Sequence, residues 1–424
     1  MRPGGVVVVA TARVTPARRA AFAVVRRVFE QGAYADRALH AEARGLDPRE
    51  RAFAMRLAYG TVQRKLSLDH MIEALARPVA DLDGATLAAL RLGLYQLAFL
   101  DGGGAHAVVG ESVELAKQGP GGGHKLVNAV LRRASRELPR LPSDDTPAGA
   151  AIAHSYPQWI VDLWWEAFGA DDARALLRRG NEPAETALRA NALVTTRDAL
   201  QAALPVPSHT DDELPEALVA DGPFDAHGHE LWRAGAYATQ SRAAMLVART
   251  LDPQPGERVL DLCAAPGGKT THLSALMGAE GEIVAVERHA GRAQALERTA
   301  ARMHATNVTV LIGDAARDTP QGGFDRVLVD PPCSGLGTLQ SHPDLRWRTS
   351  PEAIETMAKA QQAILEAGVR ALAPGGTLVY STCTLSPREN EQQVAAASLR
   401  LQSDRLVLPH RDRTDGFFIA RLTA

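Results

Sequence analysis

The chain has 424 residues, of which 46% are hydrophobic and 23% are charged, and its formal net charge is −2. This length exceeds what one ordinary core accommodates and predicts two or three domains. The near-neutral charge excludes a protein that attracts nucleic acid through its overall field, so any nucleic-acid surface must be local. No apolar stretch approaches the roughly 20 residues that cross a bilayer, and the apolar run at residues 6–9 is too short for a signal sequence. We expect a cytoplasmic protein without a membrane partner.

Cysteine is rare in this chain. The three cysteines include no C-x-x-C pair. This pattern argues against a disulfide framework and against a structural zinc site, so we expect no metal.

Residues 17–140 have a helical pattern throughout. Apolar side chains recur every three to four positions, as at Phe22, Val25 and Phe29, and glycine-rich breaks separate the helices. No strand pattern appears, which predicts an all-α domain. Arginines cluster near both ends of this region, and a solvated helix face explains them as well as RNA contact does.

A small mixed domain is predicted to follow over residues 151–234. A linker rich in Pro, Ser and Asp at residues 141–147 precedes it. An aromatic helical segment at residues 157–169, a strand beginning near Leu188, and loops with short strands at residues 205–229 indicate a small α+β unit.

From residue 235 to residue 424, short β-type runs alternate with amphipathic helical segments. This alternation predicts an α/β Rossmann-like domain, with a parallel doubly wound sheet that binds ligands at the carboxyl ends of its strands. The tail is expected to add an edge hairpin from residues 406–408 and 416–420. The predicted strands are residues 258–263, 282–287, 308–313, 326–330 and 377–382, and the clearest helices are residues 290–303 and 351–372.

The turn after Leu262 has small residues and opens a helix, so a ligand can approach its backbone closely. A phosphate-binding P-loop would need glycine where this chain has Cys263, and a nicotinamide-binding G-x-G-x-x-G pattern is absent. A nucleoside cofactor without a phosphate chain predicts an acidic residue at the end of the next strand, for the ribose hydroxyls. Glu287 supplies it, and Asp314 could meet the adenine edge. Together these residues fit S-adenosylmethionine.

Two thiols, Cys333 and Cys383, each follow a short apolar run, as active-site residues do at strand ends. A thiol in Asp-Pro-Pro-Cys (330–333) favours attack on carbon, whereas many N-methyltransferases carry Asn-Pro-Pro-aromatic. Cytosine C5 becomes nucleophilic once a thiolate adds at C6, and Asp330 can stabilise charge at the N3 side of the ring. A free thiol titrates near ~8.5, and Lys269 is expected to lower that pKa. The base must leave its stack or already lie in a loop. The spacing leaves open which thiol is the nucleophile.

These motifs resemble those of the RsmB (Sun/Fmu) family of ribosomal RNA cytosine-C5 methyltransferases. The resemblance covers nearly the whole chain. Its motifs are Asp-Leu-Cys-Ala-Ala-Pro-Gly-Gly-Lys-Thr (261–270), Asp-Pro-Pro-Cys-Ser-Gly (330–335), His-Pro-Asp-Leu-Arg-Trp (342–347), Ser-Thr-Cys-Thr (381–384) and Glu-Asn-Glu (389–391).

The resemblance implies that Cys383 is the nucleophile and that Cys333 assists elimination and product release. It also implies that the turn and three carboxylates bind the cofactor. The implied catalytic residues are Cys383, Cys333, Asp330 and Lys269, and the implied cofactor-binding residues are Cys263, Ala264, Ala265, Pro266, Gly267, Gly268, Lys269, Glu287, Asp314 and Asp330.

The helical region resembles the NusB RNA-binding fold at residues 57–62, 91–97 and 125–132, which implies a role in substrate docking. Some positions depart from the family pattern. Glu287 stands where aspartate is commoner, Ser241 where an acidic residue is frequent, and Gly110 where a polar residue is common. Either carboxylate at position 287 can accept hydrogen bonds from a ribose.

We therefore expect an S-adenosylmethionine-dependent methyltransferase that modifies C5 of a cytosine in 16S rRNA through a covalent adduct. The same chemistry on tRNA is the first alternative, and the NusB-like region favours rRNA. A non-catalytic RNA-binding or ribosome-assembly factor is the second, against which the two thiols and the complete cofactor turn argue. An N-methyltransferase is the third, disfavoured by Cys333.

Overall fold

A computed structural model describes residues 14–76, 78–101, 104–119, 121–320 and 322–424, so the apolar run at residues 6–9 lies outside the described residues. The chain divides into two compact units. The first extends to Asp162 and includes His342–Asp344, and the second comprises Leu163–Ser341 and Leu345–Ala424. Among the described helices, none combines the length and the apolar character needed to span a membrane.

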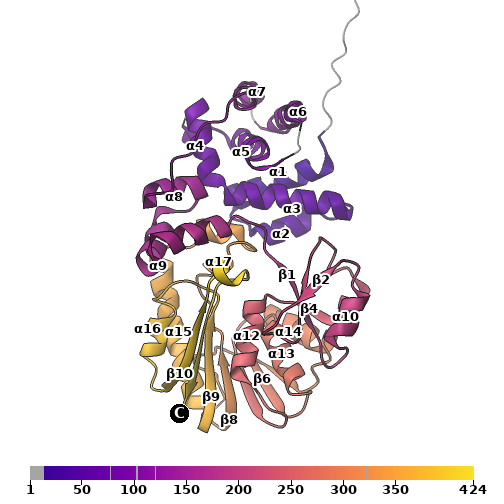
Figure 1. Cartoon of the computed structure of the whole chain (residues 1–424), viewed down its shortest axis with the longest axis vertical. Coiled ribbons are helices and arrows are strands. Elements are labelled where there is room, and N and C mark those ends of the chain that lie inside the picture. Colours follow the sequence, from indigo (N-terminus) through magenta and orange to yellow (C-terminus); the bar gives the residue numbers. More distant parts are fainter. Residues whose placement is uncertain (1–13, 77, 102–103, 120, 321) are drawn as a thin grey trace, which may run out of the picture. The chain divides into compact units, whose positions relative to one another are not determined.

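The first unit is helical, and its described residues before residue 155 form no strand (Figure 1). This confirms the predicted all-α region. Its elements are α1 (Pro16–Gln31), α2 (Ala35–Glu42), α3 (Pro48–Gln63), α4 (Lys65–Leu75), η1 (Val79–Asp81), α5 (Gly84–Phe99), α6 (Ala105–Ala116), α7 (Gly123–Ala134) and α8 (Pro147–His154).

Helix α5 is the centre of this unit. It is apolar around most of its circumference and contacts α1, α3, α4, α6 and α7. Gly93 permits the close approach of α7, because a Cβ there would lie 2.5 Å from Leu131 Cδ1. Among the buried polar residues of α5 is Arg91, which forms two hydrogen bonds of 2.7 and 2.8 Å with the Asp69 carboxylate of α4. Pairing a buried charge in this way avoids the large cost of leaving it alone.

The second unit begins within α9 (Gln158–Arg179), which is interrupted at Gly169 with φ 81°. A small antiparallel sheet follows in the order β2-β3-β1-β4, which confirms the predicted α+β region. Strand β4 lies after residue 234, the predicted end of this domain, and pairs with β1. The elements are β1 (Thr186–Ala190), α10 (Arg197–Ala203), β2 (Ser208–Thr210), β3 (Ala217–Ala220), α11 (Glu230–Arg233) and β4 (Tyr237–Thr239).

The rest of the second unit is built on a seven-stranded sheet with the order β10-β11-β9-β8-β5-β6-β7. Figure 1 labels β10, β9, β8 and β6 of this sheet. Strands β7, β6, β5, β8 and β9 are parallel, and β11 and β10 extend the sheet antiparallel. The predicted doubly wound sheet and edge hairpin are confirmed. The strands are β5 (Arg258–Leu262), β6 (Glu282–Glu287), β7 (Val308–Ile312), β8 (Phe324–Val329), β9 (Leu372–Thr382), β10 (Arg400–Val407) and β11 (Phe417–Thr423).

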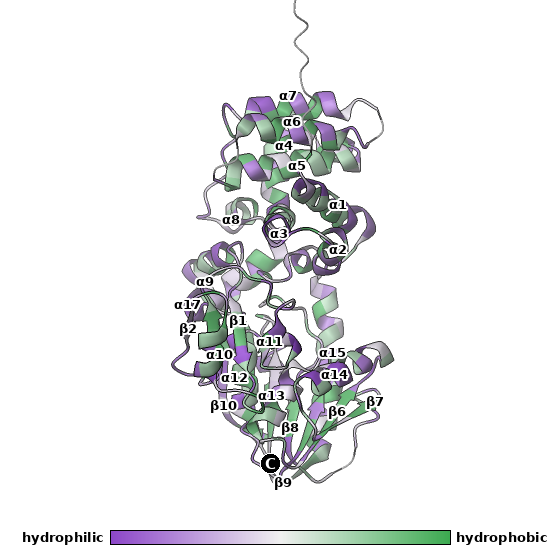
Figure 2. Cartoon of the chain, turned by 90° about the vertical axis from the view of Figure 1, so that its right-hand side faces the viewer, coloured by the Kyte–Doolittle hydropathy of each residue, from purple (hydrophilic) through white to green (hydrophobic). Residues whose placement is uncertain are grey.

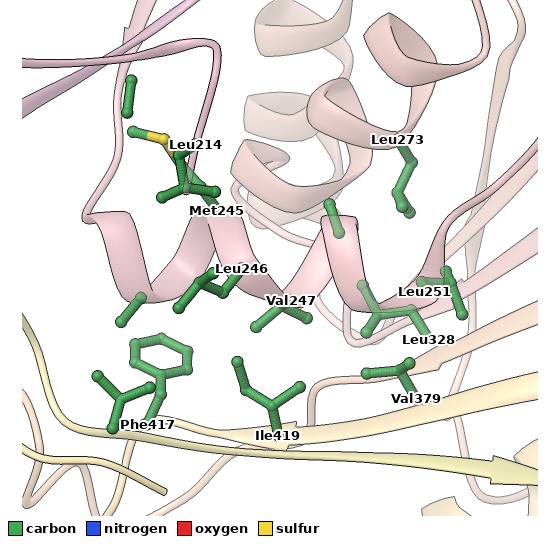
Figure 3. Packing of buried hydrophobic residues seen from close by; sticks show 14 of the residues in the cluster. Leu214, Met245, Leu246, Val247, Leu251, Leu273, Leu328, Val379, Phe417 and Ile419 are labelled. Atoms are coloured by element: carbon green, nitrogen blue, oxygen red, sulfur yellow. The ribbon is translucent and has the colours of Figure 1, made fainter. Parts of the chain in front are cut away.

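Helices cover both faces of this sheet, and strands such as β6 and β8 are mainly hydrophobic (Figure 2). On one face, apolar side chains of α12 meet those of β9 and β11 (Figure 3). Residues of α15 and α16 cover the other face. The helices and helical turns are α12 (Arg242–Leu251), α13 (Gly268–Leu276), α14 (Ala290–Arg302), η2 (Pro343–Trp347), α15 (Pro351–Ala371), α16 (Glu391–Ala395) and α17 (Pro409–Asp412).

Polar side chains join the small sheet to the helices of the large one. The fully buried Arg189 of β1 donates to Thr271 Oγ1 at 2.9 Å. Glu216 lies 2.8 Å from His272 Nε2 and also pairs with Arg249. Burial acts to raise the pKa of Glu216, but its hydrogen bonds with His272 and Arg249 outweigh that effect and hold the pKa well below its ordinary value. These contacts fix the small domain against α12 and α13.

Candidate active site

The strand order places the predicted site where the direction of winding reverses. Strand β5 lies between β6 and β8, so the chain runs outward from β5 in one direction and returns on its other side through β8 and β9. Side chains that follow β5, β8 and β9 therefore meet at one edge of the sheet, which is where α/β sheets bind ligands. The backbone N–H of Asp330, just after β8, lies 3.5 Å from the Leu262 carbonyl oxygen at the end of β5.

The turn between β5 and α13 exposes backbone to a ligand. Cys263 and Gly267 have positive φ values of 66° and 101°, and Ala264 N–H donates to the Val286 carbonyl of β6 at 3.1 Å. Glycine is favoured at position 267 because its φ of 101° strains other residues, and because a Cβ there would lie 2.5 Å from Leu296 Cδ1. Gly268 begins α13 and has no atom within 4 Å of the position that a Cβ would take. Its open side leaves room for a molecule to approach the helix N-terminus.

Carboxylates surround this turn. Asp261 is buried at the end of β5, and its Oδ2 accepts a hydrogen bond of 2.6 Å from Thr270. Burial raises the pKa of Asp261 to about 7, and Asp330 adds to the rise. Burial also raises the pKa of the Cys263 thiol to about 12, helped by Asp330, Asp261 and Glu287. The turn is therefore an electronegative site with a neutral thiol.

Glu287 and Asp314 end the next two strands outward. Glu287 is buried as the last residue of β6, where its Oε1 accepts from His289 N–H and its Oε2 lies 3.7 Å from Arg292 Nε. Arg292 also donates to the Ala265 carbonyl at 2.8 Å, which links Glu287 to the turn. Asp314 lies after β7, two strands from β5, and its Oδ1 accepts from Ala316 N–H within its own turn.

These residues fit S-adenosylmethionine better than a phosphate-bearing cofactor. A phosphate would meet the carboxylates of Glu287 and Asp330, and like charges repel. A sulfonium cation and ribose hydroxyls suit the same carboxylates. The open backbone at Gly268 provides the space for close approach.

Lys269 and Asp330 connect the turn after β5 to the residues that follow β8 and to the end of β9. Lys269 Nζ lies 2.7 Å from Asp330 Oδ2, and Ser381 Oγ of β9 donates to Asp330 Oδ1 at 2.7 Å. Burial acts to lower the pKa of Lys269, but Asp330 outweighs it and the pKa rises, with a smaller contribution from Cys383. Lys269 is thus a permanent cation whose first partner is Asp330. That Lys269 lowers the pKa of a thiol and contacts the cofactor stays a prediction from the sequence.

The two predicted catalytic thiols are adjacent. Cys333 Sγ, after β8, lies 3.3 Å from Cys383 Sγ, after β9, and both cysteines are free. The hydrogen bond with Cys383 and burial raise the pKa of Cys333 well above its ordinary value. Cys333 is therefore a neutral thiol that can donate a proton beside Cys383.

Sequence reasoning did not find several polar residues that support these groups. Ser381, Gln361 and Ser334 form hydrogen bonds with Asp330, the Pro332 carbonyl and Glu389, respectively. Gln361 gave a usable signal, since it is a polar residue on the otherwise apolar face of α15 that packs on the sheet. Serines adjacent to motif residues carry little signal of their own.

Models of known protein families match three successive regions of this chain. A family model described as 16S rRNA methyltransferase RsmB/F matches residues 248–423, a NusB family model matches residues 15–136, and a model of the ferredoxin-like domain of RsmF/B-like methyltransferases matches residues 156–227.

Full-length relatives and solved structures agree with these matches. A probable ribosomal RNA small subunit methyltransferase B of Synechocystis is 37% identical, over 96% of this chain and 99% of the relative. The ribosomal RNA small subunit methyltransferase B of Vibrio cholerae is 33% identical, over 96% and 97%. The crystal structure of PH0851 covers 98% of this chain and all of its own, with a TM-score of 0.82 and 25% identity.

Proposed function

Because this chain belongs to the RsmB family and is an S-adenosylmethionine-dependent RNA methyltransferase, we propose that it methylates C5 of a cytosine in 16S rRNA through a covalent adduct with Cys383. The observation that carries the mechanism is the distance of 3.3 Å between Cys333 Sγ and Cys383 Sγ. Two thiols at this spacing can act on the same pyrimidine ring, one forming the bond to carbon and the other assisting its release.

The proposed chemistry uses residues that converge on the thiols. Cys383 adds as a thiolate to C6, forming a C–S bond and making C5 nucleophilic. Bound S-adenosylmethionine supplies an electrophilic methyl group. Asp330, held by Lys269 and Ser381, stabilises charge on the N3 side of the ring. Loss of the C5 proton to water then restores the C5–C6 double bond, the C6–S bond breaks, and the sulfur of Cys383 leaves as a thiolate. Cys333, as a neutral thiol, assists this elimination by donating a hydrogen bond to the departing thiolate.

The cofactor assignment extends to the residues of the electronegative turn. We propose that the backbone from Cys263 to Gly268 cradles S-adenosylmethionine, that Glu287 accepts hydrogen bonds from its ribose, and that Asp314 meets the adenine edge. The acidic surroundings and the open side of Gly268 support this proposal.

We propose 16S rRNA as the target because the NusB match and the names of the full-length relatives both favour it. The division of labour follows the predicted domains: residues 17–140 dock RNA, residues 151–234 form the linker, and residues 235–424 carry the reaction. The same reaction on tRNA remains the second candidate, since the thiol geometry is common to both.

Two alanine variants test the mechanism. Cys383→Ala is expected to abolish both methylation and the covalent protein–RNA adduct. Cys333→Ala is expected to retain the adduct, visible as a shifted band on a denaturing gel, because release is impaired. Adduct in Cys383→Ala and its absence in Cys333→Ala would reverse the two roles, and methylation with both thiols removed would refute the mechanism.

Bisulfite mapping of RNA from a deletion strain tests the target. Loss of one cytosine signal in 16S rRNA, restored by complementation, is the expected result. An unchanged rRNA profile with a missing tRNA mark would contradict the proposal in favour of tRNA.

A further inference from the structure

A buried network of hydrogen bonds lies beside both catalytic loops, and the proposed mechanism does not use it. Its centre is Glu389-Asn390, two consecutive residues that are 0% and 1% exposed. A buried carboxylate is costly unless it is fully paired, so its retention calls for a reason. The partners of this pair provide one.

Glu389 holds the loop of Cys333. Its Oε1 accepts from the backbone N–H of Ser334 at 2.8 Å and from Gln361 Nε2 at 3.0 Å, and its Oε2 accepts from Ser334 Oγ. Gln361 Nε2 also donates to the Pro332 carbonyl at 2.9 Å. The residues on either side of Cys333 are therefore tied to one carboxylate.

Asn390 holds the loop of Cys383 in the same way. Its Oδ1 accepts from Thr382 Oγ1, and its Nδ2 donates to the Thr384 carbonyl at 3.0 Å. Thr382 and Thr384 are the two neighbours of Cys383. A third link joins the two loops directly, since Thr384 Oγ1 and Ser334 Oγ lie 2.6 Å apart.

We infer that Glu389 and Asn390 are positioning residues that together set the spacing of the two thiols. Because the two side chains project from adjacent positions of one chain segment, the loop held by each cannot move independently of the other. The inference rests on the proposed two-thiol mechanism for its functional meaning, but the spacing itself can be measured without RNA or cofactor.

Conservative variants separate this role from bulk packing. The Glu389 carboxylate accepts from Ser334 N–H, Ser334 Oγ and Gln361 Nε2. Glu389→Gln keeps the volume but removes the negative charge that strengthens these bonds, and it reverses the bond with Ser334 Oγ, which must then accept from the amide N–H. Asn390→Asp places an oxygen against the Thr384 carbonyl. Glu391→Gln is the matched control, because Glu391 is the next residue but is exposed.

The rate of disulfide formation between Cys333 and Cys383 reports the thiol spacing. Diamide is the oxidant: two S–H bonds are lost, one S–S bond forms, and the N=N bond of diamide takes up the two electrons and two protons. The full chain carrying Cys263→Ala leaves only these two thiols. We expect Glu389→Gln and Asn390→Asp to slow the reaction about tenfold relative to Glu391→Gln, which is the effect of losing one charged or buried hydrogen bond. A rate equal to or faster than that of the control would overturn the inference.

Thr384→Val is a milder second variant if the first two fold poorly. It removes the hydroxyl that meets Ser334 at nearly constant volume, and Thr384→Ser restores that hydroxyl. Slower disulfide formation in Thr384→Val that is rescued in Thr384→Ser supports the inference, and equal rates in both overturn it.

Methylation assays on the native chain then distinguish the inference from the proposed function. We expect kcat to fall about tenfold in Glu389→Gln with an unchanged KM for S-adenosylmethionine, and the adduct with RNA to accumulate, because Cys333 is displaced. A slower disulfide reaction without any adduct in Cys333→Ala would support the positioning role and contradict the two-thiol mechanism. Lower kcat with an unchanged disulfide rate would contradict the positioning role alone.

Discussion

The cofactor turn (residues 263–269) and the thiol loops (residues 330–334 and 381–390) lie at the same edge of one sheet but are built differently. The turn consists mainly of small residues and open backbone, with glycine at 267 and 268. The thiol loops are held by hydrogen bonds of buried side chains between segments as much as 55 residues apart. A small molecule must be able to reach its binding site, and open backbone without large side chains leaves room for it. Two reacting side chains need a fixed separation, which only a paired polar network provides.

Among variants that keep both thiols, Lys269→Met should have the largest effect on methylation, because Lys269 belongs to both regions. Its ammonium neutralises Asp330 across 2.7 Å, and its loss leaves Asp330 without that partner beside Asp261 and the thiols. We expect kcat/KM for methylation to fall by about 100- to 1000-fold. Lys269→Arg, which keeps the charge, should recover part of the loss. A fall of less than about threefold in Lys269→Met would contradict this assignment.

Asp261→Asn tests the electrostatic character of the turn through the pH dependence of stability. The pKa of Asp261 is raised to about 7, chiefly by burial, so between about pH 4 and pH 7 the native state binds more protons at this group than the unfolded state. Its contribution to stability therefore falls as pH rises through this range and is constant above it. Between pH 5 and pH 8 we expect Asp261→Asn to gain on the order of 2 kcal/mol relative to wild type.

Denaturant unfolding at several pH values measures this difference. Parallel stability curves for the two proteins would show that the Asp261 carboxyl is already ionised at pH 5, and would contradict the raised pKa.

Substitutions at the two glycines of the turn should have different effects, one on the stability of the protein and the other on the binding of the cofactor. Gly267→Ala should destabilise the protein by about 2 kcal/mol, because φ is 101° and the new Cβ would lie 2.5 Å from Leu296 Cδ1. Gly268→Ala should leave unfolding unchanged, since its Cβ meets nothing within 4 Å, but should weaken S-adenosylmethionine binding about tenfold by filling the open side. Denaturant unfolding and calorimetric titration measure the two effects. Equal changes in both variants would remove the distinction.

Ser241→Ala measures the effect of losing one hydrogen bond that lies outside the cofactor turn and outside the thiol loops. Ser241 is the N-cap of α12, and its side chain accepts from Ala244 N–H at 3.4 Å. The expected loss is about 1 kcal/mol in unfolding free energy, with no change in the rate of the Cys333–Cys383 disulfide reaction. Ser241→Asp, which restores the acidic residue frequent in the family, should cap equally well. A changed thiol rate in Ser241→Ala would show that disulfide formation reports general stability.

Several features of the site were accessible to sequence reasoning because they depend on local pattern. The runs before Cys263, Asp330 and Cys383 predict strands, and parallel strands bring their carboxyl ends to one edge. The departure at Ser241 is also explained locally, since serine and aspartate are both good N-caps. By contrast, no local pattern shows that Arg189 is fully buried and donates a hydrogen bond to Thr271 of α13.

By itself the sequence determined the order of strands and helices, the turn that can admit a cofactor, and the presence of two thiols at strand ends, because each follows from residue types within a few positions of one another. Only the tertiary structure decided that Lys269 pairs first with Asp330, that the sulfurs lie 3.3 Å apart, and that Glu389 and Asn390 face the two loops. These contacts depend on the positions of α15 and of residues 386–390 on the sheet. The packing of the whole core determines those positions, and no local run of residues does.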